Sequence, residues 1–206
     1  RQAGNRPMPY KKFDPSKLER LNDPGRLESI PPHALWEALG APIEARDIVE
    51  IGAGTGLFAS ALLEFAPHAR VFAADVEEPM LRWMRDNRPE VDAGRLVVVA
   101  SSETGVPLPD ESADVVYMVN VHHELADPRA IYSEAFRLLR PSGRVLVADW
   151  APIDTPKGPP MAVRASAAEL CDFLGRAGFE GMRVHDGALP WHSLVTATRP
   201  LPTEGP

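Results

Sequence analysis

The segment DIVEIGAGTGLF, residues 47–58, decides the fold of this chain. Its first five residues form a short, mostly apolar run that predicts a buried strand, and the residues after the glycines have the apolar spacing of a helix. Between the two lie three alternating glycines, Gly52, Gly54 and Gly56. Glycines allow a sharp turn and a close approach of the backbone to a ligand. Because Glu50 precedes them by two positions, the segment places a carboxylate at the tip of the strand.

The alternation of strand and helix continues along the chain. Further strands are predicted at residues 70–75, 95–100, 113–120, 144–150, 179–187 and 192–199. Helices are predicted at residues 31–40, 55–66, 78–87, 128–139 and 167–178, the fourth of them ended by a turn at 140–143. This order predicts an α/β fold with a doubly wound, mostly parallel sheet of seven strands, in which we expect the last strand to be antiparallel. In such a sheet, ligands bind outside the carboxyl ends of the strands.

The composition is that of an ordinary globular domain. The chain has 206 residues, of which 44% are hydrophobic and 25% are charged. We therefore expect a single domain over residues 31–200, preceded by an N-terminal arm at 1–30 and followed by a flexible tail at 201–206. A net charge of -7 gives no general attraction to phosphate backbones, so a nucleic-acid partner is not expected.

A membrane partner, a disulfide bond and a metal site are also not expected. No apolar run approaches the roughly 18 residues that span a bilayer, and the N-terminus has no apolar stretch typical of a signal peptide. The sequence therefore predicts a cytoplasmic protein without a membrane partner. Its single cysteine, Cys171, lies in a predicted helix and is interpreted as a packed side chain, and no metal site is indicated.

The spacing of the glycines separates two classes of cofactor. A dinucleotide-binding loop has the pattern GxGxxG, but here the position of the third glycine is taken by Leu57 and the pattern is GxGxG. A carboxylate at Glu50 would also repel a diphosphate, whereas it favours a ligand that carries an ammonium and a sulfonium group. A nicotinamide-dependent oxidoreductase and a non-catalytic binding or regulatory module are the alternatives to an enzyme that uses such a cationic ligand.

Four stretches resemble the class I S-adenosylmethionine-dependent methyltransferases, in particular the small ones of ubiquinone and menaquinone biosynthesis. They are EIGAGTG, VFAAD, VPLPDESADVV and FRLLRPSGRVLVADW, all within residues 31–150. Residues 13–32, FDPSKLERLNDPGRLESIPP, resemble the helical cover that these enzymes fold over the cofactor. The resemblance implies a Rossmann-like methyltransferase fold, S-adenosylmethionine as the cofactor, and transfer of its methyl group to an acceptor.

The resemblance also implies a cofactor site. Asp75, at the end of the second strand, is expected to accept hydrogen bonds from both ribose hydroxyls, and Glu50 with the glycine loop to face the methionine part. The adenine contact is left open, because the family often has an Asp where this chain has SSE at 101–103. Without a ligand, Glu50 would be a solvated strand end, Asp75 a helix N-cap and the glycines a plain turn. The expected cofactor-binding residues are Glu50, Gly52, Ala53, Gly54, Gly56, Asp75, Val76, Ser102, Glu103 and Asn120.

The acceptor is expected at the ends of the fourth and fifth strands. The segment NVHHELADP follows the fourth strand, and Asp149 and Trp150 end the fifth. A neutral histidine is a suitable base for a hydroxyl or thiol acceptor, so His122 and His123 are the predicted catalytic residues. Either one could instead cap or pack against the following helix. The NPPY-type tetrapeptide of amino-directed nucleic-acid methyltransferases is absent, which favours a small-molecule acceptor.

Overall fold

The computed structural model of the chain describes residues 16–40 and 44–202, so that residues 1–15 of the predicted arm and 203–206 of the predicted tail lie outside the described residues. The strands are β1 (Asp47–Ile51), β2 (Arg70–Asp75), β3 (Leu96–Ala100), β4 (Ala113–Val119), β5 (Leu139–Trp150), β6 (Glu180–Val184) and β7 (His192–Thr198). The described α-helices are α1 (Ser16–Leu21), α2 (Gly25–Ser29), α3 (Pro32–Ala38), α4 (Leu57–Leu63), α5 (Glu78–Asn87), α6 (Pro89–Asp92), α7 (Pro128–Leu138) and α8 (Ala167–Arg176). Two 3-10 helices are η1 (His122–Glu124) and η2 (Met161–Val163).

The strands form one seven-stranded sheet in the order β3-β2-β1-β4-β5-β7-β6. The pairs from β3 to β5 are parallel, and β7 is antiparallel to both β5 and β6. This order confirms the predicted doubly wound α/β fold and the antiparallel last strand. The strand order reverses between β1 and β4, because β2 and β3 are added on one side of β1 whereas β4 and β5 are added on the other. A ligand crevice is expected at that point.

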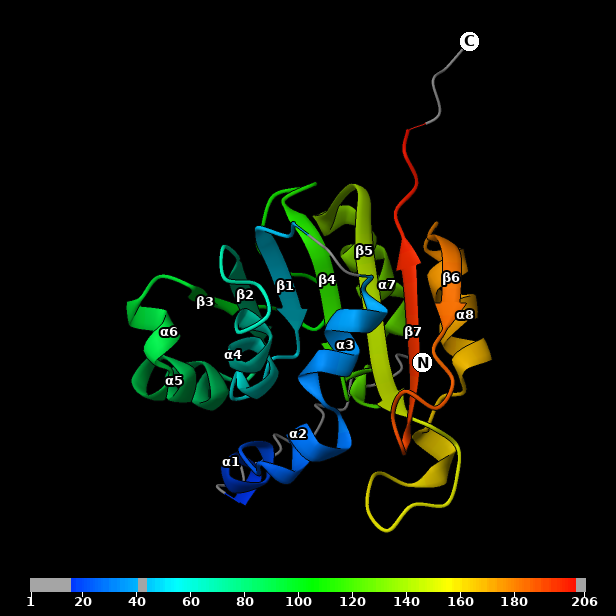
Figure 1. Ribbon diagram of the computed structural model, residues 1–206, viewed down its shortest axis with the longest axis horizontal. Helices are drawn as coiled ribbons and strands as arrows, with labels where there is room; N and C mark the ends of the chain where they lie inside the picture. The colour runs from blue at the N-terminus through cyan, green and yellow to red at the C-terminus, as the bar shows by residue number, and fades with distance from the viewer. Residues whose placement is uncertain (1–15, 41–43, 203–206) are drawn as a thin grey trace, which may run out of the picture.

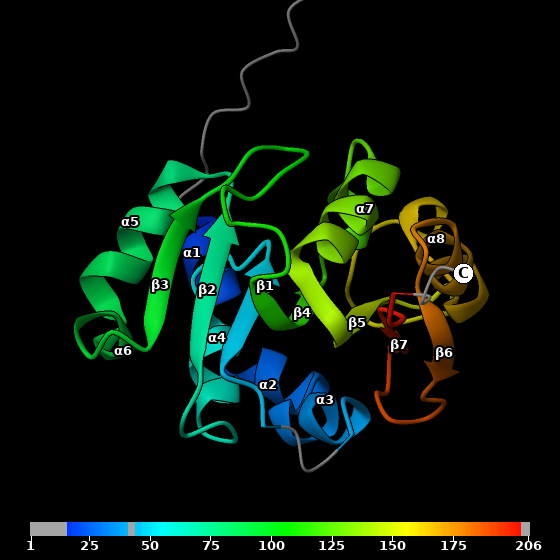
Figure 2. The same ribbon diagram turned by 90° about the horizontal axis from the view of Figure 1, so that it is seen from above.

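Helices cover both faces of the sheet, as Figures 1 and 2 show for α3 in front and for α7 and α8 behind. One hydrophobic core lies between the sheet and α3, α4 and α5 and includes Leu35. The other lies between the sheet and α7 and α8 and includes Leu170. Consecutive residues of a strand point to opposite faces, so Ile48 of β1 belongs to the first core and Val49 to the second. Burial on both faces explains why the central strands read as nearly continuous apolar runs.

The structure differs from the sequence prediction at residues 140–143. The predicted turn is wrong, because these residues are part of β5, which begins at Leu139 directly after α7. Leu139 already pairs with Ala113 of β4, and the register of the two strands then shifts. Ser142 has a φ of 66°, a left-handed conformation that bends the strand without reversing the chain. The Pro-Ser-Gly signal therefore marks an irregularity within a strand.

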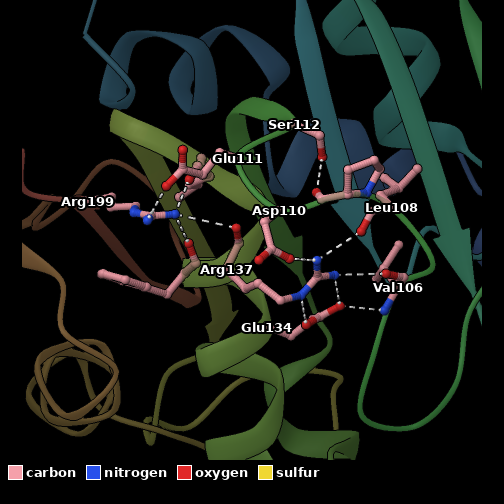
Figure 3. A network of polar contacts seen from close by, with 11 residues as sticks. Val106, Leu108, Asp110, Glu111, Ser112, Glu134, Arg137 and Arg199 are labelled. Carbon is pink, nitrogen blue, oxygen red and sulfur yellow. Dashed lines mark hydrogen bonds and ion pairs between the residues drawn. The ribbon is translucent and has the colours of Figure 1, made fainter. Parts of the chain in front are cut away.

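Arg137 of α7 attaches the segment between β3 and β4 to this helix (Figure 3). Its guanidinium group binds both carboxylate oxygens of Glu134, at 2.7 and 2.6 Å, and pairs with Asp110 at 2.6 Å. It also donates to the carbonyls of Val106 and Leu108, at 3.1 and 2.9 Å. Glu134 accepts a further bond from the Val106 amide at 2.8 Å. The VPLPDES residues that contribute to the family resemblance thus have a structural role, because they fix the chain before β4.

Replacing Arg137 should weaken the fold measurably. Arg137→Met leaves the mostly buried Glu134 carboxylate without its charged partner, so we expect the free energy of unfolding to fall by about 1–3 kcal/mol. Arg176→Met is the matched control, because Arg176 pairs with Asp172 where both side chains are more than half exposed. That change should cost about 0.3–0.5 kcal/mol. Urea denaturation of both variants checks the difference, and equal losses would show that the Arg137 network is as weak as a surface ion pair.

Candidate functional site

The carboxyl ends of the strands form the edge of the sheet on which the predicted site residues gather. Helices α1 and α2 lie at this edge, and so does the segment 151–166 that connects β5 to α8 (Figure 1). The glycine loop after β1 faces the same edge. The N-terminal helices and the segment 151–166 thus lie at the same sheet edge as the ends of β1 and β4 (Figure 1).

The glycine loop is held by backbone bonds to β2. The amides of Gly52 and Ala53 both donate to the carbonyl of Ala74, at 2.8 and 2.9 Å. Gly52 has a φ of 74°, and a Cβ atom at this position would lie 2.5 Å from Cγ2 of Val121. A side chain is therefore excluded both by the backbone conformation and by the space. The fold therefore requires glycine at position 52.

Asp75 connects the end of β2 with the glycine loop. Its Oδ2 atom accepts from the Gly54 amide at 2.7 Å, and its Oδ1 atom accepts from the Glu77 amide at 2.9 Å. Asp75 is 8% exposed, and burial raises the pKa of its carboxyl although these amide bonds oppose the rise. The N-cap position of α5 is Glu77, so Asp75 is not a helix cap. Each carboxylate oxygen keeps a free lone pair for a ligand, and Val76 beside it is 49% exposed.

Glu50 is a buried acid without a partner for one of its oxygens. It is 2% exposed, and its Oε2 atom has no hydrogen bond within the described residues. Burial raises the pKa of Glu50 to about 8, although the neighbouring Tyr117 hydroxyl and the Arg26 guanidinium group oppose this rise. Tyr117 lies opposite Glu50 in the pairing of β1 with β4. The interpretation of Glu50 as a solvated strand end is therefore wrong, and a cationic ligand would stabilise its ionised form.

Asn120 follows β4 in a strained conformation. Its φ of 58° is uncommon for a residue other than glycine, and its Oδ1 atom is buried without a partner in the described part of the chain. Ser102 and Glu103 are exposed. The Ser102 amide and hydroxyl both donate to the carbonyl of Gly105, which closes a turn. The structure thus brings Asn120 to the crevice, while the adenine contacts of Ser102 and Glu103 stay predictions.

The two histidines of η1 have different surroundings. Nδ1 of His122 lies 3.0 Å from the Tyr132 hydroxyl, and its ring makes edge contacts with the rings of Tyr132 and Phe173. Burial lowers the pKa of His122. Nδ1 of His123 instead lies 2.8 Å from Oδ1 of Asp149. His122 therefore packs between α7 and α8, and His123 pairs with an acid.

Asp149 gives His123 the properties of a base. Asp149 is fully buried, and its Oδ1 atom also accepts from the Trp150 amide at 2.8 Å. Burial lowers the pKa of His123, but the hydrogen bond and charge of Asp149 outweigh this effect, so that the net shift is upward. Because the carboxylate accepts the proton on Nδ1, the Nε2 atom of neutral His123 carries the lone pair. Nε2 lies 3.8 Å from Oε1 of Glu124, beyond hydrogen-bond distance, so that its lone pair can accept a proton from a ligand.

His192, the first residue of β7, belongs to the same edge and was not predicted. It is 7% exposed, and neither of its ring nitrogens has a partner among the described residues. Its ring centroid lies 4.4 Å from that of Trp150, which is its partner in the pairing of β5 with β7. Burial lowers the pKa of His192 to about 4, so the ring is neutral near pH 7. Only the placement of β7 beside β5 reveals this residue, and the local sequence contains no signal for it.

Several unpartnered groups lie at this edge of the sheet. Buried polar atoms without a hydrogen bond occur on Glu50 of β1, Asn120 after β4, Asp149 of β5 and His192 of β7, and also on Ser60, Glu77, Glu90 and Tyr117, within the part of the chain that the structure describes. Buried polar groups in folded proteins nearly always have a partner. The exceptions near the ends of β1, β4 and β5 and at the start of β7 therefore fit a ligand that supplies the missing partners.

Two other features are absent from residues 16–40 and 44–202. These residues contain no group of three or more His, Cys, Asp or Glu side chains arranged to hold a metal ion. None of the helices in these ranges has the length and apolar composition needed to cross a membrane.

Comparison with known proteins identifies the family. Residues 49–147 match a family model described as a methyltransferase domain. A probable S-adenosylmethionine-dependent methyltransferase of Mycolicibacterium smegmatis is 34% identical over 152 residues, which are 71% of this chain and 56% of the relative. The ubiquinone/menaquinone biosynthesis C-methyltransferase of Paracoccus denitrificans is 30% identical over 150 residues, 68% of this chain and 57% of the relative. The chain thus spans little more than half the length of these curated relatives.

A solved structure supports the same assignment. The crystal structure of an S-adenosylmethionine-dependent methyltransferase from Aquifex aeolicus has a TM-score of 0.82 at 29% identity, covering 91% of this chain and 100% of that one. Residues 49–147 therefore belong to a methyltransferase domain, the fold is that of the class I methyltransferases, and the chain is similar to S-adenosylmethionine-dependent members of that class. The resemblance predicted from the glycine loop and the three other stretches is confirmed.

The pH dependence of stability should reveal the buried acid. The pKa of Glu50 in the folded protein, about 8, lies above the ordinary value of 4.5, so the unfolded chain releases a proton that the folded chain retains between these pH values. Wild-type stability should therefore fall as the pH rises through this range. Glu50→Gln does not titrate, and relative to wild type it should gain on the order of a few kcal/mol of stability between about pH 5 and pH 9.

Urea denaturation of the protein without cofactor measures this gain. The control is Glu64→Gln at the exposed C-terminal end of α4, whose stability relative to wild type should not change with pH. A Glu50→Gln variant with the same pH dependence as wild type would contradict the buried, protonated state of Glu50.

Proposed function

We propose that the protein transfers the methyl group of S-adenosylmethionine to a small molecule that carries an ionisable hydroxyl group, and that His123 takes the proton of this hydroxyl. The observation that carries the proposal is the pairing of His123 with the fully buried Asp149, at the same sheet edge as the unpartnered side chains of Glu50 and His192. The relatives support methyl transfer through their names. The methyl acceptor of this chain is inferred from its own residues.

The cofactor half of the site fits S-adenosylmethionine. Glu50 offers a carboxylate to the ammonium group of the methionine part, and the two oxygens of Asp75 can accept from the ribose hydroxyls. The left-handed glycines let the loop backbone approach the ligand closely, and the exposed Val76 beside Asp75 offers an apolar surface to the adenine. When bound there, S-adenosylmethionine supplies an electrophilic methyl group on a sulfonium. The protein has to orient it and exclude water.

The acceptor half fits a hydroxyl group. His123 accepts the hydroxyl proton on Nε2, and Asp149 stabilises the resulting imidazolium through Nδ1. The bound cofactor would supply its methyl group to the deprotonated acceptor oxygen and leave as the neutral thioether, and His123 would release its proton to solvent. Neutral His192 offers one N–H donor and one nitrogen acceptor to position the polar end of the acceptor. In a phenol, loss of the same proton also activates a neighbouring ring carbon, so this arrangement serves methylation at oxygen or at carbon.

Cofactor preference tests the class of enzyme. S-adenosylhomocysteine at 100 times its Kd should stabilise the protein by about 2.7 kcal/mol, and NADH at the same concentration should have no effect. Asp75→Ala should weaken the binding of S-adenosylhomocysteine by about 1.5–3 kcal/mol, because the ribose hydroxyls lose a charged acceptor. Thermal unfolding and calorimetry measure both effects. Stabilisation by NADH alone would support an oxidoreductase instead and overturn the proposal.

Substitution of the two neighbouring histidines tests whether His123 is the base. His123→Ala should lower the methylation rate by about 100- to 10,000-fold while the affinity for S-adenosylhomocysteine stays nearly unchanged. His122→Ala is the matched variant, because it removes a ring that packs against Tyr132 and Phe173. It should lower the melting temperature and change the rate of the folded protein only severalfold. A panel of phenols and enols with methyl-labelled cofactor supplies the acceptor.

The Asp149 pairing gives a second measurement that needs no acceptor. Asp149→Asn removes the charge that raises the pKa of His123, so this pKa should fall. Nuclear magnetic resonance titration of the His123 ring in wild type and variant reports it directly. Full turnover in His123→Ala, or an unchanged His123 pKa in Asp149→Asn, would remove the pair from the mechanism.

A further inference from the structure

A hollow of about 450 Å³ lies at the amino ends of β1, β2 and β3. This edge of the sheet is opposite to the one at which α1 and α2 lie (Figure 1). An arginine stands at the start of each of the three adjacent strands: Arg46 directly precedes β1, Arg70 is the first residue of β2, and Arg95 directly precedes β3. All three line the hollow. Because ligands of doubly wound sheets bind at the carboxyl edge, this hollow is separate from the site described above.

The pairing of the strands holds the three arginines side by side. The Arg70 amide donates to the Arg46 carbonyl at 2.9 Å, and the Val71 amide donates to the Arg95 carbonyl at 2.8 Å. Neighbouring strands are about 4.8 Å apart, so the three side chains start from positions only one strand apart from each other. Positive charges at such spacing repel one another unless an anion lies between them.

Two of the three guanidinium groups are fixed by contacts that leave donors over. Nε of Arg70 donates to Oδ1 of Asp47 at 2.7 Å, and its Cζ atom lies 4.9 Å from the ring centroid of Phe72. Arg95 donates through Nε and Nη2 to carbonyls at the C-terminal end of α4, those of Ala69 at 3.3 Å, Leu63 at 3.0 Å and Ala66 at 2.8 Å. Both Nη atoms of Arg70 and Nη1 of Arg95 have no partner among the described residues. These donors are held in place without a bond of their own.

The third guanidinium group, that of Arg46, has no polar contact within the part of the chain that the structure describes, although the Arg46 amide donates to Asp114. The exposed ring of His68 adds another nitrogen group to the lining. Asp47 is the one acid among the lining residues, and its second oxygen accepts from Arg140 at 2.8 Å. Its charge is therefore shared between two arginines and does not neutralise the hollow.

The charge and size of the hollow indicate the class of ligand. Three arginines against one shared acid leave an excess of about two positive charges, in a chain whose net charge is -7. Guanidinium groups bind carboxylates and phosphates in the same paired geometry. A carboxylate carries one charge, whereas a phosphate monoester carries about −1.5 to −2 near pH 7 and three acceptor oxygens. A volume of about 450 Å³ also accommodates more than a bare ion.

We propose that this hollow binds a phosphate dianion, with Arg46, Arg70 and Arg95 donating to its oxygens. The ligand is either free phosphate or the phosphate group of a small organic monoester. The two fixed arginines orient the phosphate group, and the longer reach of the unpaired Arg46 side chain lets it close over the bound anion. The site lies at the other edge of the sheet from the proposed methyl transfer, so neither proposal depends on the other.

The experiment compares three probes on the intact protein by calorimetry at low salt, since screening weakens exposed charge pairs. The probes are ribose 5-phosphate, inorganic phosphate and ribose. Wild type should bind both phosphates with a saturable isotherm and ribose not at all. Arg46→Gln should weaken both phosphates by about 10-fold or more, which is the loss expected for a charge-assisted hydrogen bond. The side chain of Arg46 has no polar partner in the described residues, so this change leaves the fold intact.

Arg129→Gln is the matched control, because it removes the same charge from the exposed first turn of α7. It should keep the wild-type affinities. Tighter binding of ribose 5-phosphate than of inorganic phosphate would identify an organic monoester as the ligand, and equal affinities would identify free phosphate. Nuclear magnetic resonance should show the Gly94 amide and the His68 ring, which line the hollow, shifting on titration of wild type.

Three results would overturn the proposal. One is the lack of saturable phosphate binding by wild type, and another is an equal loss in Arg46→Gln and Arg129→Gln, which would reduce the effect to net charge. The third is competition between ribose 5-phosphate and S-adenosylhomocysteine, which would move the binding to the carboxyl edge of the sheet. A protein that binds phosphate in the hollow but does not bind S-adenosylhomocysteine would contradict only the proposed function.

Discussion

The hydrogen bond from the Gly54 amide to the Asp75 carboxylate is the interaction on which the site depends. It joins the loop after β1 to the end of β2, and the second oxygen of the same carboxylate fixes the turn before α5 through the Glu77 amide. The glycine loop and the start of α5 are thus held by one side chain. Under the proposed function the same carboxylate accepts hydrogen bonds from the ribose, so one side chain both shapes the loop and contacts the ligand. A change at Asp75 therefore affects geometry and binding together.

The buried and strained groups at this sheet edge carry a free-energy cost that the rest of the fold has to offset. A buried carboxyl at Glu50, a left-handed Asn120 and a histidine without partners at His192 each oppose folding. The two apolar cores on the faces of the sheet and the Arg137 network at its back provide the compensating stability. Unpartnered buried groups at the edge where ligands bind in this fold are typical of a binding site, since a ligand that supplies the missing partners is bound more tightly than one that does not.

Local patterns predicted most of the fold. Strands at 47–51 and 70–75 and the helix at 78–87 coincide with the observed elements, because apolar periodicity and flanking glycine or proline residues are local signals. The β5 irregularity at Ser142 was misread as a turn, because the pairing of Leu139 with Ala113 depends on residues far apart in the sequence. Glu50 and Asp75 were recognisable from their positions at strand ends.

The acceptor side was less predictable for the same reason. His122 and His123 are adjacent in the sequence and chemically identical, and only their neighbours from α7, α8 and β5 separate a packed ring from a paired one. His192 lies at this sheet edge through the last strand, far along the chain from the glycine loop. No spacing rule relates the two. Three-dimensional contacts were needed to find it.

The position of β7 has a consequence for how the chain acquires its structure. Strand β6 pairs only with β7, which follows it in the sequence and inserts between β6 and β5. During synthesis, β6 therefore has no sheet to join until β7 has emerged, and the edge of β5 stays open for the same period. The half of the sheet that holds the glycine loop can pair earlier, from contacts among β1 to β5. Closure of the acceptor side, with His192 at its edge, is thus expected to be the slowest event in folding, and the stage at which an unpaired strand edge is exposed to association with other chains.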